Sequence, residues 1–70
     1  MFKIGDRIRC MIPDALIHGK PGIVLAIPGE DFPGYNTRAY YIVWVYGEEI
    51  SKKNQCAWAL ADREMELADV

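Results

Sequence analysis

Apolar and polar side chains alternate along several short stretches of this chain, and clusters of proline, glycine and polar residues separate those stretches. Alternation with a period of two is typical of a β-strand that buries one face. Prolines and glycines interrupt the pattern and predict loops at 13–21 and 28–38, and a polar turn is expected at 51–54. The pattern predicts five strands, at residues 7–12, 22–27, 39–46, 55–61 and 64–68.

The alternation also indicates which side chains face inward. In the first strand, Ile8 and Cys10 point to the core, and the arginines beside them point to solvent. The stretch 39–46 is β-branched or aromatic almost throughout, so its register stays open between two choices. The inward set is either Tyr41, Val43 and Val45 or the alternate set Tyr40, Ile42, Trp44 and Tyr46.

Residues 56–68 fit a second interpretation, in which they form one helix. Its apolar stripe would hold Trp58, Ala61, Met65 and Ala68. Leu60 and Leu67 lie off that stripe, and the alternation favours two strands joined by a single helical turn at 61–63. We therefore predict an all-β fold with a short helical turn before the last strand, and the helix stays the alternative for this segment.

Seventy residues make one domain, spanning 1–70. The hydrophobic fraction of 51% excludes a disordered chain, and for so short a domain it indicates that some apolar surface serves a partner. The strand pattern starts directly after Met1, which argues against a signal peptide. No apolar run approaches the ~20 residues that a membrane-spanning helix needs.

The net charge of −2 is concentrated at one end of the chain. Residues 1–60 contain seven Lys and Arg against six Asp and Glu, whereas the last ten residues contain one against four. Neither balance resembles the strongly basic composition of a dedicated nucleic-acid-binding domain.

We find no pattern that indicates catalysis, a cofactor or a metal site. Cys10 and Cys56 lie far apart and lack Cys-x-x-Cys spacing, so we expect reduced thiols in a cytoplasmic protein. His18 lies in a loop without a neighbouring carboxylate, which is typical of a surface histidine.

Two segments resemble a known family. Residues 4–9 have the sequence Ile-Gly-Asp-Arg-Ile-Arg, and residues 19–24 have the sequence Gly-Lys-Pro-Gly-Ile-Val. This order is similar to the GDxVxV strand and the GKxGxV turn and strand that open KOW-type and related SH3-like barrels. The resemblance implies a five-stranded SH3-like barrel in which Gly19 and Gly22 occupy turn positions with positive φ. Later landmarks that fit are Tyr41-Ile42-Val43, Trp58 and Glu64–Leu67.

Three relatives of that barrel imply different functions. KOW domains of ribosomal and transcription proteins imply contact with RNA or polymerase, and the β chain of nitrile hydratase, which ends in a similar barrel, implies a structural subunit. The plasmid-borne, trimethoprim-insensitive dihydrofolate reductases are tetramers of such barrels and need Val-Gln-Ile-Tyr on the fourth strand. The matching region here is Gln55-Cys56-Ala57-Trp58, which argues against reductase activity.

The strand at 39–46 is the main candidate for a binding surface, because it is bulky and apolar on both faces where one face is normally polar. A covering by the 28–38 loop or by the C-terminal segment is the alternative use of that face. An aromatic cage for a cation, built from Tyr40, Trp44, Tyr46 and Trp58, is a narrower version of the same hypothesis. The predicted protein interface consists of Tyr40, Ile42, Trp44, Tyr46, Val24 and Ala57.

Basic residues make a second candidate surface, for nucleic-acid phosphates, although acidic residues are interspersed among them. These residues are Arg7, Arg9, Lys20, Arg38, Lys52 and Lys53. Taken together, we expect a non-enzymatic binding module without a cofactor, which associates through its aromatic face with itself or with a protein partner. The alternatives are a KOW-like nucleic-acid-binding domain and an oligomeric barrel enzyme.

Overall fold

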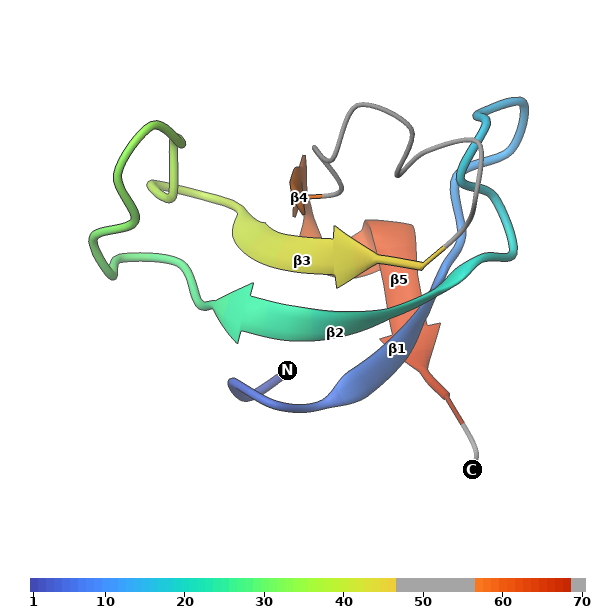
Figure 1. Cartoon of the computed structure of the whole chain (residues 1–70), viewed down its shortest axis with the longest axis horizontal. Helices are drawn as coiled ribbons and strands as arrows, with labels where there is room; N and C mark the ends of the chain where they lie inside the picture. The colour runs from blue at the N-terminus through green and yellow to red at the C-terminus, as the bar shows by residue number, and fades with distance from the viewer. Residues whose placement is uncertain (47–56, 69–70) are drawn as a thin grey trace.

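A computed structural model describes residues 1–46 and 57–68. Five strands and one 3-10 turn follow each other in the predicted order (Figure 1). The expected turn at 51–54 and the first two residues of the strand expected at 55–61 lie outside the described residues. The elements are β1 Arg7–Cys10, β2 Pro21–Ala26, β3 Tyr41–Val45, β4 Ala57–Leu60, η1 Asp62–Glu64 and β5 Met65–Leu67.

The all-β prediction is confirmed, and the helical alternative is wrong for the described part of 56–68. Strand, 3-10 turn and strand follow each other there, because Trp58 and Leu60 alternate with small residues and pack toward the core. The carboxylate of Glu64 accepts a hydrogen bond from the Ala61 backbone N–H at 2.8 Å. This contact closes the turn and directs the chain into β5.

The strands form one antiparallel sheet in the order β4-β3-β2-β1-β5. In Figure 1 the sheet curls, so that β4 and β5 lie behind β2 and β3. Among the described residues no backbone pairing joins β4 to β5. Closure of the sheet into a barrel therefore stays a prediction.

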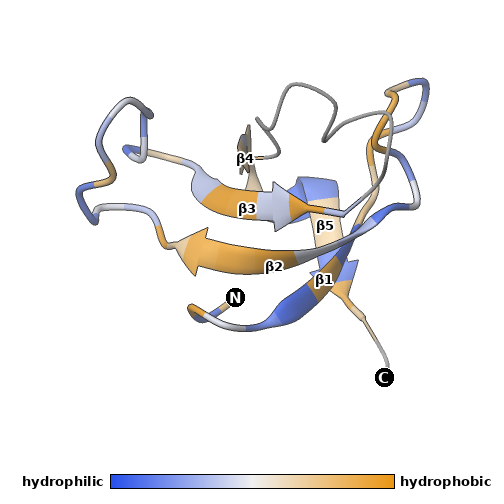
Figure 2. Cartoon of the chain, viewed as in Figure 1, coloured by the Kyte–Doolittle hydropathy of each residue, from blue (hydrophilic) through white to orange (hydrophobic). Residues whose placement is uncertain are grey.

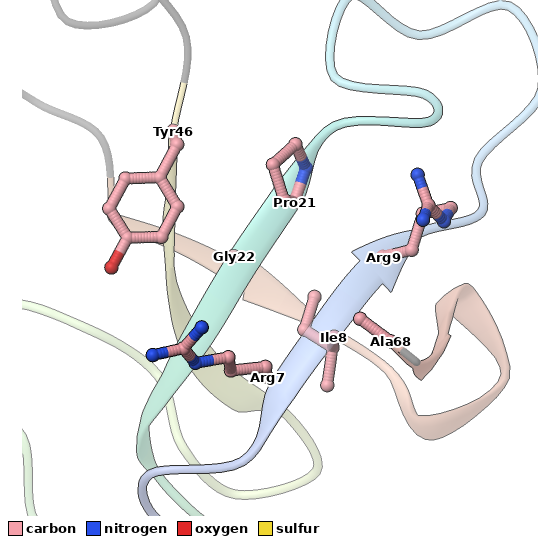
Figure 3. A pocket seen from close by; sticks show the side chains of 7 residues that line it. All are labelled: Arg7, Ile8, Arg9, Pro21, Gly22, Tyr46 and Ala68. Atoms are coloured by element: carbon pink, nitrogen blue, oxygen red, sulfur yellow. The ribbon is translucent and has the colours of Figure 1, made fainter. Parts of the chain in front are cut away.

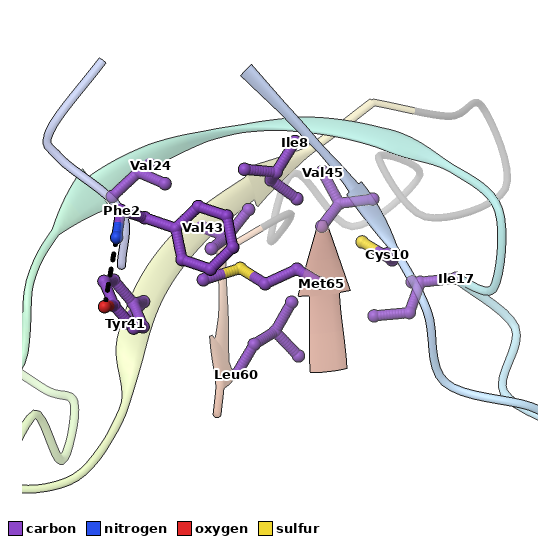
Figure 4. Close-up of a cluster of buried hydrophobic side chains, with 10 residues drawn as sticks. All are labelled: Phe2, Ile8, Cys10, Ile17, Val24, Tyr41, Val43, Val45, Leu60 and Met65. Carbon is purple, nitrogen blue, oxygen red and sulfur yellow. Dashed lines mark hydrogen bonds between the residues drawn. The ribbon is translucent and has the colours of Figure 1, made fainter. Parts of the chain in front are cut away.

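The core lies inside the curled sheet and takes side chains from every strand (Figure 4). The first of the two registers for β3 is confirmed, since Tyr41, Val43 and Val45 are buried in this cluster. Ile17, which falls in the loop expected at 13–21, is also fully buried. The full cluster is Phe2, Ile8, Cys10, Ile17, Val24, Tyr41, Val43, Val45, Leu60 and Met65.

The hydroxyl of Tyr41 connects three parts of the chain at one end of the core. It accepts a hydrogen bond from the Phe2 backbone N–H at 3.3 Å and donates one to the Asp62 carboxylate, also at 3.3 Å. The Phe2 and Tyr41 rings meet edge to face with their centroids 5.4 Å apart. These contacts hold the N-terminal residues and η1 against β3.

The two glycines singled out by the family resemblance play different roles. Gly19 has φ of 81° and occupies the expected positive-φ turn position. The same prediction is wrong for Gly22, which lies in β2 and is absent from the described positive-φ positions. A Cβ on Gly22 would come within 2.7 Å of the Trp44 carbonyl oxygen and 2.9 Å of Val43 Cγ1. The missing side chain therefore allows β2 and β3 to approach closely.

Candidate functional site on the outer sheet face

The strand register aligns four side chains across the outer face of the sheet. Arg7 of β1 lies opposite Ile23 of β2. Ile23 lies opposite Trp44 of β3, and Trp44 lies opposite Ala57 of β4. Their neighbours along each strand point to the core, so this row points to solvent. Figure 2 shows that β1 begins hydrophilic, whereas much of β2 is hydrophobic.

A second outward row runs beside the first, nearer the loop that joins β1 to β2. Arg9 lies opposite Pro21, and the Tyr46 backbone N–H donates to the Pro21 carbonyl oxygen at 2.9 Å. Tyr46 is 50% exposed and Trp44 is 37% exposed. The two rows together place two large aromatic side chains in contact with solvent, beside two arginines.

The structure corrects two members of the predicted interface. Val24 points inward into the core cluster, because it pairs with the inward-facing Val43. Ile42 points outward as expected but has no exposed surface. Tyr40, Trp44 and Tyr46 are exposed and Ala57 is half-buried, so these four remain available on the surface.

The loop between β2 and β3, residues 27–40, is tied to the neighbouring strand β4. The Tyr35 hydroxyl donates to the Ala57 carbonyl oxygen at 3.3 Å, which ties the loop to β4 on the far side of β3. Phe32 packs edge to face on Tyr35 with ring centroids 5.6 Å apart. Ile42 is fully buried, whereas Trp44 and Tyr46 are exposed. The expected alternative, a covering of this face by the 28–38 loop, stays a prediction.

The aromatic cage is not assembled. Trp58 pairs with the inward-facing Val43 and packs against the core, while Trp44 and Tyr46 point outward. The sheet thus separates Trp58 from Trp44 and Tyr46 of the predicted cage. Its indole Nε1 is buried without a hydrogen-bond partner in the described residues.

A pocket of about 360 Å³ lies between the two outward rows (Figure 3). Ile8 and Gly22 pair directly and lie between the two rows. The Ile8 side chain is buried and Gly22 has no side chain. The backbone of these two residues therefore forms the floor of the pocket on the outer face. The walls are Arg7, Arg9, Pro21, Tyr46 and Ala68. The alternation of the first strand predicted that both arginines point outward, but Pro21 and Ala68 were not expected in a site.

The two arginines of the pocket differ in their partners. Within the described residues, Arg7 makes no side-chain hydrogen bond or ion pair. Arg9 Nη1 donates to the Gly19 carbonyl oxygen at 3.3 Å. Glu66 lies opposite Arg9 on β5, without an ion pair between the two. Within the described residues neither arginine is neutralised by an ion pair, and only the guanidinium of Arg7 makes no hydrogen bond.

Two other members of the predicted basic set that the structure describes, Arg38 and Lys20, do not line this pocket. Arg38 lies in the β2–β3 loop, where its backbone N–H bonds to the Asn36 side chain at 2.9 Å. Lys20 directly precedes β2 and does not line the pocket. Lys52 and Lys53 lie outside the described residues. Of the described members of the predicted set, Arg7 and Arg9 line the pocket.

Other chemistry is sparse in the part of the chain that the structure describes. No group of three or more His, Cys, Asp or Glu side chains there is arranged to hold a metal ion. None of the described helices has the length and apolar character to cross a membrane. Cys10 is fully buried, and burial raises the pKa of its thiol to about 11.

No family model, curated protein or solved structure matches this chain. The similarity to KOW-type and SH3-like barrels therefore stays a prediction, and the function has to be argued from the outer face itself.

Proposed function

We propose that this protein is a non-enzymatic binding module that holds an extended segment of a partner protein against its outer sheet face. The supporting observation is the exposure of Trp44 and Tyr46, at 37% and 50%, on one end of β3. Burying large aromatic side chains gains hydrophobic free energy, and such residues commonly anchor protein interfaces.

The size of the open surface favours a segment over a second folded copy. Ile42 is buried, which leaves an apolar area on the order of a few hundred Å² around Ile23, Trp44 and Tyr46. A stable interface between folded subunits takes ~800 Å² from each, roughly a sixth of this molecule's 4857 Å². An extended peptide can use a small patch, because its alternate side chains anchor it.

The distribution of charge favours protein over nucleic acid. Binding along a nucleic-acid backbone uses several phosphate contacts from one continuous basic surface. Arg38 lies apart from the pocket in its own loop, and the net charge of the chain is −2. Among the described residues, Arg7 and Arg9 beside the two aromatics suit a partner that is mainly apolar with a local negative charge.

A displayed library of random peptides tests this proposal. We expect selection against the wild type, with counter-selection against Trp44→Ser, to yield peptides with micromolar affinity. Trp44→Ser should weaken them at least about tenfold, because it removes the central aromatic anchor. The matched control is Leu16→Ser, which changes an equally apolar side chain, 77% exposed, in the β1–β2 loop, and should leave affinity unchanged.

Three results would contradict the proposal. The first is a selection without any peptide that Trp44→Ser weakens. The second is light scattering that gives twice the 8.0 kDa chain mass and returns to monomer on Trp44→Ser, since a second copy would then occupy the face. The third is a single-stranded oligonucleotide that binds this face with steeply salt-dependent affinity.

A further inference from the structure

The pocket between the two outward rows combines a cation, a hydroxyl group and apolar walls. Arg7 supplies a guanidinium without a partner in the described residues, and Figure 3 shows it on the same side of the pocket as the Tyr46 ring. Pro21 and Ala68 supply apolar surface. A volume of about 360 Å³ is within the range of small-ligand pockets.

The floor of the pocket offers no free backbone donor. Backbone bonds flank the Ile8–Gly22 pair on both sides, from Val24 N to Asp6 O at 3.0 Å and from Cys10 N to Lys20 O at 2.9 Å. Together with the pairing of Ile8 and Gly22 between them, these bonds use the backbone N–H groups of the floor within the sheet. Recognition in the pocket therefore depends on the side chains of its walls.

The chemistry of Arg7 selects the ligand. A guanidinium is charged at every physiological pH, and its fork of N–H donors matches the two oxygens of a carboxylate or a phosphate. The Tyr46 phenol adds one O–H donor. Arg9, turned toward Gly19, adds positive potential without occupying the pocket with an ion pair.

We propose that this pocket binds an oxyanion, a carboxylate or phosphate group, with Arg7 as its main ligand and the Tyr46 hydroxyl as a second donor. In the complex, the oxyanion belongs to an acidic side chain of the segment docked on Trp44, and this part rests on the proposed function. The pocket itself also binds free oxyanions.

The register predicts the spacing of the partner's residues. Arg7 and Trp44 lie in one row with Ile23 between them, about 10 Å apart at the usual distance between strands. An extended peptide advances about 3.3 Å per residue. A segment crossing the strands therefore places its acidic residue about three positions from the apolar residue that packs on Trp44.

NMR titration of the ¹⁵N-labelled protein with inorganic phosphate, and separately with acetate, tests the pocket. Chloride keeps the ionic strength constant. We expect saturable shifts confined to the amides around Arg7, Gly22 and Tyr46, with half-saturation on the order of 1–10 mM for such small ligands. Comparison of the two anions shows whether the pocket prefers a phosphate or a carboxylate.

Variants separate the pocket from general surface charge. Arg7→Gln should raise the half-saturating concentration at least about tenfold, and Tyr46→Phe should raise it by a smaller factor. The matched control is Arg38→Gln, which removes the same charge from the β2–β3 loop and should leave the titration unchanged. Linear shifts with both anions, or saturable shifts that survive Arg7→Gln, would overturn the proposal.

A third variant distinguishes this proposal from the proposed function. Trp44→Ser should abolish peptide binding but leave the phosphate and acetate titrations as in the wild type. Saturable anion binding without any peptide ligand would support the pocket and reject the peptide-binding function. Selected peptides that lack an acidic residue, and whose affinity Arg7→Gln does not change, would reject the pocket's role in the complex.

Discussion

Folding opposes the ionisation of the Cys10 thiol. Burial raises its thiol pKa to about 11 from an ordinary value of 9.0, because the thiolate loses its hydration in the core. Between these two values the folded state retains a proton that the unfolded state releases. Stability from this source is therefore complete below pH 9 and is lost as pH rises through 11.

We expect the free energy of unfolding to fall by about 3 kcal/mol between pH 8 and pH 12 through this thiol. Urea unfolding across that range measures it, with Cys56 replaced by Ser throughout. Tyrosines and lysines also titrate there, so the control is the same series for Cys10→Ala, and the difference between the two curves isolates the thiol. A difference that is independent of pH would show that Cys10 does not carry the effect.

The sequence of a single element does not indicate how much of its surface the fold leaves exposed, and β3 is an example. Ile42 and Trp44 of β3 both point outward, yet Ile42 is fully buried and Trp44 is 37% exposed. The Tyr35 hydroxyl of the β2–β3 loop reaches the carbonyl oxygen of Ala57, the β4 residue opposite Trp44. The proposed binding surface is the part of an apolar strand that the fold leaves exposed.

At the level of elements, the close approach of β2 and β3 depends on Gly22. We expect Gly22→Ala to lower the free energy of unfolding by about 1–3 kcal/mol, because the new Cβ meets the Trp44 carbonyl oxygen at 2.7 Å. Adding Val43→Ala should not restore stability, since the carbonyl belongs to the backbone and cannot move aside independently. Denaturant unfolding of the single and double variants measures both effects.

Recovery of stability in that double variant would instead assign the strain to Val43 Cγ1, which lies 2.9 Å from the same Cβ. An unchanged stability of Gly22→Ala itself would show that the two strands have room for a methyl group.

For the whole molecule, the contacts of Tyr41 join segments from both ends of the chain. The Tyr41→Phe variant keeps the ring in the core but leaves the Phe2 backbone N–H without its partner at 3.3 Å. We expect a loss of about 1–2 kcal/mol in the free energy of unfolding. Thermal or urea unfolding measures it, and Tyr40→Phe, which removes a hydroxyl from the neighbouring exposed tyrosine, is the control and should have little effect.

If Tyr41→Phe and Tyr40→Phe proved equally stable, the hydrogen bonds from the hydroxyl would contribute nothing to holding the two ends together. The edge-to-face contact between the Phe2 and Tyr41 rings, with centroids 5.4 Å apart, would then be the remaining link.

The amino-acid sequence by itself determined the five strands, the helical turn before the last one and the direction of each side chain in β1. These properties depend on a period of two and on proline and glycine positions, which are local and visible in a single chain. It also singled out the stretch 39–46 as a candidate surface, because a strand that is apolar on both faces indicates an unusual use of one of them, but it left the register of that strand open.

Only the tertiary structure decided which outward residues remain in contact with water. Ile42 and Trp44 have the same orientation in one strand, yet the first is fully buried and the second is 37% exposed. Ile17 turns inward from a predicted loop, for reasons of packing that its neighbours in sequence do not show. The pocket depends on cross-strand register, since it joins Arg7, Pro21 and Tyr46 from three separate segments. Local patterns set the direction of a side chain, whereas its surroundings are set by the segments that the fold brings against it.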